Sequence, residues 1–168
     1  LPKKLSYTTG AWLQGEASAT GPFTEELVGR KTGIVDNTAT GFITVTVLNR
    51  DAYARIVVDY YVNSDNYDRV VTGRIHVLVV RFGGATTVTA IAEVDAQLGA
   101  NSRGAETMTV TFANSANTGA VGATQTFTIN VTIDSSVAAS VQRIQYQATV
   151  LTAYYNTSDT RNITIAAA

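Results

Sequence analysis

Hydrophobic and polar residues alternate along most of the chain from Phe42 onward, which is the pattern of β-strands with one buried face. The alternation is clearest between 126 and 133, where apolar residues alternate with threonine and asparagine. Short stretches rich in Gly, Asn, Asp and Ser separate these segments and indicate turns. The positions expected to be buried are Ile43, Val45, Val47, Ala54, Ile56, Val58, Tyr60, Val62, Met108, Val110, Phe112, Phe127, Ile129, Val131, Ile133, Ile144, Tyr146, Ala148, Val150, Ile163 and Ile165.

The segment from Arg69 to Asp95 predicts a central β-hairpin. Two β-type runs meet at Gly83-Gly84, and a Gly-Gly pair suits a two-residue turn because glycine adopts positive φ without steric cost. With these glycines as the loop, one register places the apolar residues on one face. The expected pairs are Phe82 with Ala85, Val79 with Val88, Val77 with Ala90, Ile75 with Ala92, Arg74 with Glu93 and His76 with Ile91.

The chain therefore predicts an all-β fold, an antiparallel β-sandwich of about eight strands with jelly-roll or Greek-key topology. No convincing amphipathic helix interrupts the strands, and no repeat of roughly 20 to 50 residues indicates a propeller or solenoid. A loop of about ten residues is expected after Asp95, over the stretch AQLGANSRGAE. An exposed, mobile loop is expected over 113–124, where the side chains are small.

Residues 1–41 are the least periodic part, and we expect an extended N-terminal arm with short strands before a sandwich domain over 42–168. Both prolines of the chain lie in this arm. A short helical turn is expected between Gly21 and Leu27, with Thr24 as its cap. Trp12 is expected to pin the arm to the sandwich by burying a large surface, or to form a stacking platform for a sugar or a partner.

Charge and composition narrow the classes of function. The formal net charge is -1 and the twelve Lys and Arg residues are dispersed, which argues against nucleic-acid binding. The absence of cysteine excludes disulfides, thiolate zinc sites and cysteine nucleophiles. No apolar run reaches the roughly 18 residues of a membrane-spanning helix, so we expect no membrane insertion. The chain starts at Leu1 rather than Met, so we expect a segment upstream of it.

Candidate catalytic residues are few. His76 is the only histidine, it lies mid-strand, and no G-x-S-x-G motif accompanies it. Glu93 and Asp95 are two residues apart on one strand, so their carboxylates share a side at about 7 Å, a spacing that glycoside hydrolysis uses. An enzyme acting through Glu93 or His76 on polysaccharides or esters is a third hypothesis. We expect no enzyme and no cofactor.

Two groups of residues are candidates for binding. Asn63, Asp65, Asn66 and Asp68 lie in one loop and offer hard oxygen ligands for calcium. The EF-hand pattern is absent, and an Asx-rich turn is the commoner explanation of such a loop. The pairs Tyr60-Tyr61 and Tyr154-Tyr155 must each direct one ring inward and one outward. The residues expected to contact a sugar or a partner are Trp12, Tyr61, Tyr67 and Tyr155.

Three segments carry a family resemblance: FGGATTVTAIAEVDAQLG, TVTFANSANTGAVGATQTFTINVTIDSS and VQRIQYQATVL. Their Thr/Ala/Gly/Asn-rich strands, the Gly-Gly hairpin and the closing I-x-Y-x-A-x-V strand resemble the β-rich domains of virus particles, especially bacteriophage tail fibres and related attachment proteins. The resemblance covers roughly residues 42–165 and transfers no site residues. It implies a homo-oligomer, often a trimer, without cofactors. The strand count also resembles the capsid jelly roll of small icosahedral viruses, without its basic arm.

The leading hypothesis is therefore a non-enzymatic virion structural protein, a tail-fibre or host-receptor-binding β-sandwich. One alternative is a viral capsid or capsid-decoration jelly-roll protein. The other is a carbohydrate-binding or adhesin module, extracellular or at the cell surface, that uses the outward Tyr and Trp rings. We expect a homo-oligomer, a trimer or a larger assembly, with a host surface glycan or protein as partner.

Overall fold

The computed structural model describes residues 23–49, 52–64, 69–82, 85–101, 106–137, 141–154 and 163–168. These residues form nine strands and no helix. The strands are β1 (Phe23–Ile34), β2 (Thr40–Val47), β3 (Ala52–Ser64), β4 (Arg69–Phe82), β5 (Ala85–Asn101), β6 (Met108–Asn114), β7 (Gln125–Ser135), β8 (Gln142–Tyr154) and β9 (Ile163–Ala167).

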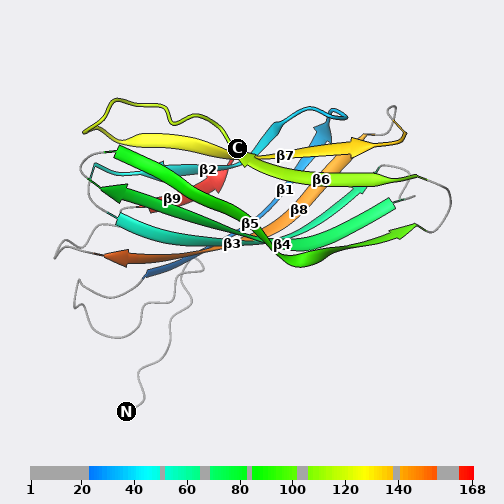
Figure 1. The fold of residues 1–168 in the computed structure, drawn as a ribbon, viewed down its shortest axis with the longest axis horizontal. Helices are drawn as coiled ribbons and strands as arrows, with labels where there is room; N and C mark the ends of the chain where they lie inside the picture. Colours follow the sequence, from blue (N-terminus) through cyan, green and yellow to red (C-terminus); the bar gives the residue numbers. More distant parts are fainter. Residues whose placement is uncertain are drawn as a thin grey trace, which may run out of the picture.

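The strands form two antiparallel sheets that pack face to face (Figure 1). The five-stranded sheet has the order β1-β8-β3-β4-β5, and the four-stranded sheet has the order β6-β7-β2-β9. In the first sheet, β3, β4 and β5 follow one another, and β8 returns beside β3 after β6 and β7 have crossed to the other sheet. This is the spatial order of a Greek key. The predicted antiparallel β-sandwich is confirmed.

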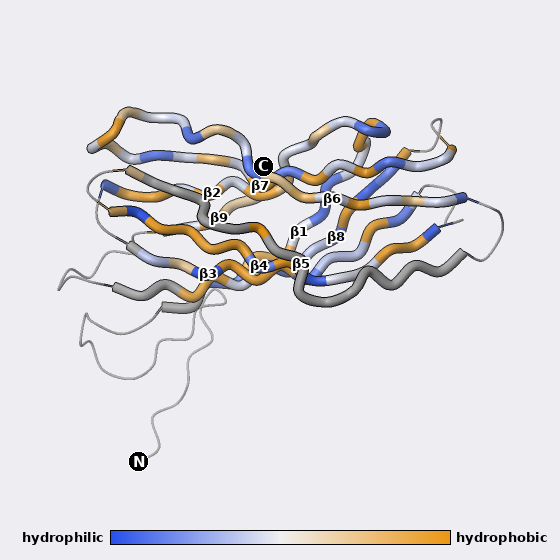
Figure 2. The backbone as a smooth tube through the Cα atoms, viewed as in Figure 1, coloured by the Kyte–Doolittle hydropathy of each residue, from blue (hydrophilic) through white to orange (hydrophobic). Residues whose placement is uncertain are grey.

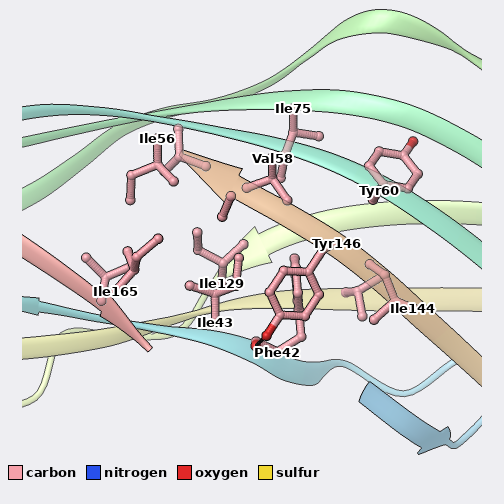
Figure 3. Close-up of a cluster of buried hydrophobic side chains, with 14 of the residues drawn as sticks. Phe42, Ile43, Ile56, Val58, Tyr60, Ile75, Ile129, Ile144, Tyr146 and Ile165 are labelled. Carbon is pink, nitrogen blue, oxygen red and sulfur yellow. Dashed lines mark hydrogen bonds between the residues drawn. The ribbon is translucent and has the colours of Figure 1, made fainter. Parts of the chain in front are cut away.

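The core lies between the inner faces of the two sheets, where the alternating apolar residues meet. Figure 2 shows hydrophobic residues along strands of both sheets, and Figure 3 shows Ile56, Val58 and Ile75 of one sheet facing Ile43 and Ile165 of the other. Nearly all positions expected to be buried are buried, and Phe112 is half-buried. Each fully buried aliphatic or aromatic side chain contributes roughly 1.5–3 kcal/mol, so this layer is the main source of stability.

Four aromatic rings link the two sheets within this core. The ring centroid of Phe42 lies 5.1 Å from that of Tyr146 and 6.0 Å from that of Phe112, and Tyr60 lies 4.7 Å from Phe112. The Tyr146 hydroxyl also donates a hydrogen bond of 2.9 Å to the Phe42 carbonyl, and Figure 3 shows the ring directed at Phe42. Burial raises the pKa of Tyr146, so its hydroxyl keeps the proton that it donates.

Two glycines make room for the two tyrosine rings. Gly29, Tyr146, Tyr60 and Gly73 lie in one row across β1, β8, β3 and β4. A Cβ atom on Gly29 would lie 2.3 Å from the Tyr146 hydroxyl oxygen, and one on Gly73 would lie 2.5 Å from that of Tyr60. Each ring therefore occupies the space above a glycine of the neighbouring strand, and the row accepts no side chain at either glycine.

The β4–β5 hairpin agrees with the predicted register only near its turn. Phe82 pairs with Ala85 as predicted, and the pair of Val79 with Val88 is also confirmed. The next pair joins Leu78 to Ala90, so one residue of β5 is extra and a bulge shifts every later pair. The four remaining predicted pairs are wrong: Val77 pairs with Ile91, Ile75 with Glu93, His76 with Ala92 and Arg74 with Asp95. The predicted inward orientation of Ile75, Val77 and Val79 is nevertheless confirmed.

Two further segments differ from the sequence prediction. Residues 23–34 form β1, which pairs with β8 from Phe23 onward, so the expected helical turn over the described residues 23–27 is wrong. The sandwich thus includes a strand from the segment that the sequence analysis assigned to the arm. The loop expected directly after Asp95 is also wrong, because β5 continues to Asn101 and pairs there with Arg69 of β4. The loop before β7 is exposed, as predicted.

Candidate functional site

The outer face of the five-stranded sheet carries a shallow depression of about 570 Å³. It lies over β1, β8 and β3, which are neighbours in the sheet. The residues that line this outer depression are Val28, Gly29, Arg30, Asp59, Tyr60, Tyr61, Gln145, Tyr146 and Gln147. Because Tyr60 and Tyr146 direct their rings into the core, the side chains that face solvent here come from the residues on either side of them.

Strand register places these outward side chains in two rows. Gln147 lies between Val28 and Asp59, because it pairs with both across the strands. In the same way, Gln145 lies between Arg30 on β1 and Tyr61 on β3. The depression therefore presents two primary amides side by side, with a tyrosine ring at one side and a valine at the other.

Two interactions fix the polar side chains at the rim. Arg74 Nε lies 2.6 Å from Asp59 Oδ1, in an ion pair whose side chains are 43% and 49% exposed. The Gln147 amide donates a hydrogen bond to the Glu26 carboxylate. These contacts hold Asp59 and Gln147 in place on rigid strands, which is the property a recognition surface needs. The surface is polar and carries both signs of charge, so it suits a neutral or zwitterionic ligand.

Of the residues predicted to contact a sugar or a partner, Tyr61 lies in the depression. Its side chain is 39% exposed, and the prediction that Tyr60 points inward and Tyr61 outward is confirmed. The other three predicted residues, Trp12, Tyr67 and Tyr155, lie outside the described residues.

The predicted calcium loop is described only at its first residue. Asn63 is buried, and its amide nitrogen donates a hydrogen bond of 2.9 Å to the Ser64 carbonyl. The amide oxygen of Asn63 has no hydrogen-bond partner. Asp65, Asn66 and Asp68 lie outside the described residues. Within the described ranges, no group of three or more His, Cys, Asp or Glu residues could hold a metal ion.

The candidate catalytic residues stay separate from the depression. His76 is half-buried on β4 and pairs with Val57 and Ala92, which are apolar. Glu93 and Asp95 pair with Ile75 and Arg74, and a register shift separates these two pairs. Val94 therefore has no partner on β4, and the regular spacing from which we inferred a carboxylate pair does not apply. The predicted opposition of Arg74 and Glu93 is wrong, because Arg74 pairs with Asp95 in the sheet and Glu93 pairs with Ile75.

The residues predicted to bind a ligand did not include Gln145, Gln147, Asp59 or Arg30. The signal available was that these polar residues alternate with buried ones, which shows that they face outward. It does not show that they are neighbours, because β1, β3 and β8 are distant in the sequence and become adjacent only in the sheet.

Comparisons with known proteins do not place this chain in a family. No family model matches it, and neither a curated protein nor a solved structure matches it significantly. The described residues include no helix that could span a membrane.

Proposed function

We propose that this protein is a non-enzymatic attachment module of a virus particle, a β-sandwich that binds a host receptor through the outer face of its five-stranded sheet. The outer depression supports the binding role, because it gathers an exposed tyrosine ring, two amides and the Asp59 carboxylate on three neighbouring strands. Arg74 of β4 holds that carboxylate in an ion pair. The virion context comes from the resemblance of the strands to tail-fibre domains. The same resemblance supports the further proposal that the protein assembles as a homo-oligomer.

A carbohydrate-binding module is the second candidate function, and the arrangement of Tyr61 beside Gln145 favours it. Sugar rings present a C–H face that packs on an aromatic ring and hydroxyl groups that both donate and accept hydrogen bonds. The primary amides of Gln145 and Gln147 also both donate and accept, and Asp59 accepts. A glycan on a receptor would therefore satisfy both candidate functions at one site.

The binding proposal predicts that Tyr61→Ala weakens binding to the receptor or glycan at least tenfold. A tyrosine ring that packs against a ligand commonly contributes more than about 1.4 kcal/mol, which corresponds to a factor of ten in the dissociation constant. A glycan array and binding to host cells would identify the ligand, and calorimetry would measure its affinity for each variant.

The matched control is Tyr53→Ala. Tyr53 lies on the same face of the same strand and has the same exposure, 39%, but it is outside the depression. We expect this variant to bind as the unchanged protein does. Equal losses from both substitutions, or no binding to any glycan or host surface by the unchanged protein, would contradict the proposed site.

The assembly proposal predicts a stable trimer in solution. Light scattering coupled to size-exclusion chromatography measures the mass directly, and the chain mass of 17.8 kDa makes a monomer and a trimer easy to separate. A trimer supports a fibre or receptor-binding role. A closed shell of many copies would replace that role with a capsid role, and a monomer at high concentration would leave only the carbohydrate-binding candidate.

A further inference from the structure

A layer of polar side chains closes one end of the sandwich core. Ser64 ends β3 and Gln142 begins β8, while Ser135 ends β7, Glu106 precedes β6 and Asp36 lies between β1 and β2. Ser64 and Gln142 are 0% exposed, Ser135 is 5% exposed and Glu106 is 6% exposed. We call these five residues the polar end layer. They come from both sheets. Most of them occupy buried positions, where the rest of the core has apolar residues.

Hydrogen bonds join the five residues into one cluster. The Glu106 carboxylate accepts one from the Ser64 hydroxyl at 3.3 Å and one from the Ser135 hydroxyl at 2.5 Å. Asp36 Oδ1 accepts one from the Ser135 backbone N–H at 2.8 Å and one from Gln142 Nε2 at 2.9 Å. Two carboxylates thus approach the same serine at the end of the core.

One buried atom in this layer has no hydrogen-bond partner. It is Gln142 Oε1, the oxygen of the amide whose nitrogen binds Asp36. Exchanging the oxygen and the nitrogen would not help, because the oxygen would then face the Asp36 carboxylate and repel it. Ser64 is the direct cross-strand neighbour of Gln142, so the amide is held among the other members of the layer. A buried oxygen in this position needs a donor or a cation.

We propose that the polar end layer binds a calcium ion, with Gln142 Oε1 and the carboxylates of Asp36 and Glu106 as its protein ligands. All of these ligand atoms are hard oxygens, which suit calcium. They do not suit zinc as well, because zinc prefers nitrogen and sulfur ligands. The ion supplies the positive partner that Gln142 Oε1 lacks and offsets the charge of the two carboxylates. The ligands come from three separate elements, which suits the flexible geometry of calcium better than the strict octahedron of magnesium.

The bound ion would fasten the β1–β2 connection, the start of β6 and the start of β8 to one another. It would therefore join the two sheets at an end where the core is polar. Asn63 is not a ligand, because alternation along β3 directs it to the opposite face from Ser64. This proposal is independent of the receptor site, since it uses none of the residues of the outer depression.

The test is calcium binding by the full chain after treatment with a chelator. Calorimetry with CaCl₂ alone should show binding at one site per chain. The melting temperature measured in chelator should rise by about 5–10 °C when calcium is added to a concentration a hundred times its dissociation constant. Two substitutions, Gln142→Leu and Glu106→Gln, should each weaken calcium binding at least tenfold.

The matched control is Gln125→Leu. Gln125 is also a buried glutamine, 5% exposed, but it lies at the start of β7, at the opposite end of that strand from Ser135. This variant should bind calcium normally, and circular dichroism in chelator should show that all three variants are folded. No heat of binding and no change in melting temperature would mean that a water molecule satisfies Gln142, which overturns the proposal. Binding that both site substitutions leave unchanged would place the ion elsewhere and overturn it as well.

Discussion

Replacing Phe42 with alanine is expected to lower the free energy of unfolding by about 3–5 kcal/mol, the range for truncating a buried aromatic residue. Phe42 is 1% exposed and its ring contacts Tyr146 of one sheet and Phe112 of the other. Both neighbours are anchored on rigid strands and cannot close the space that the ring leaves. The cost therefore includes a cavity term in addition to the lost burial. Equilibrium unfolding in guanidinium chloride measures it.

Phe82→Ala is the control for this prediction. It removes the same side chain, but Phe82 is 71% exposed at the end of β4. We expect its effect to stay within about 0.5 kcal/mol. A loss below about 1 kcal/mol for Phe42→Ala would show that the two sheets can move together to fill the cavity, and that the aromatic cluster does not hold their separation.

The buried positions could be predicted from the sequence because each strand buries one face. Residues such as Ile129 and Val131 alternate with Thr128 and Asn130, and only one orientation removes the apolar set from water. The same argument predicted that Tyr60 and Tyr146 are inside and Tyr61 outside. In these segments, local pattern and final environment agree, so burial follows from two-residue periodicity alone.

The register of β5 could not be predicted, because its sequence specifies register weakly. The stretch TTVTAIAEV offers small or β-branched residues on both faces. Between Thr86 and Ala90, where the first bulge falls, shifting the strand by one residue exchanges only threonine, valine and alanine. A bulge then costs little, and the structure contains register shifts at three places between β4 and β5.

The place of β1 in the sandwich was not predicted, for a different reason. It lies at the edge of its sheet, and its sequence includes Glu25, Glu26, Arg30 and Lys31. Charged residues on an edge strand protect its unpaired main chain from other chains, and they also remove the alternation by which strands are recognised. The outer depression was not predicted either, because β1 is one of the three strands that form it. A surface site built from strands far apart in sequence can be predicted only when the order of the strands in the sheet is known.

Replacing Arg81 with methionine is expected to lower the free energy of unfolding by about 3 kcal/mol. Arg81 is 0% exposed and points into the core from β4. Its guanidinium donates hydrogen bonds to the Val47 carbonyl at 3.1 Å, to the Asn49 side-chain oxygen at 2.8 Å and to the Ala123 carbonyl at 2.7 Å. Hydrogen bonds from a charged donor contribute roughly 1.5–3 kcal/mol each, and removing the buried charge recovers part of the cost of its desolvation.

Methionine is chosen because its unbranched side chain fills most of the space of the arginine stem, so the loss reports the hydrogen bonds and not a cavity. Arg55→Met, at an exposed position on β3, is the control and should change stability by less than about 0.5 kcal/mol.

Hydrogen exchange adds a second measurement. The Ala123 carbonyl is fixed by Arg81, so amides of the exposed loop before β7 should exchange faster in the Arg81 variant and not in the control. An unchanged stability would mean that the desolvation cost of the guanidinium cancels the contribution of its hydrogen bonds. Unchanged exchange would mean that the loop is held by its own contacts, such as the bridge between Thr118 and Thr126, and not by Arg81.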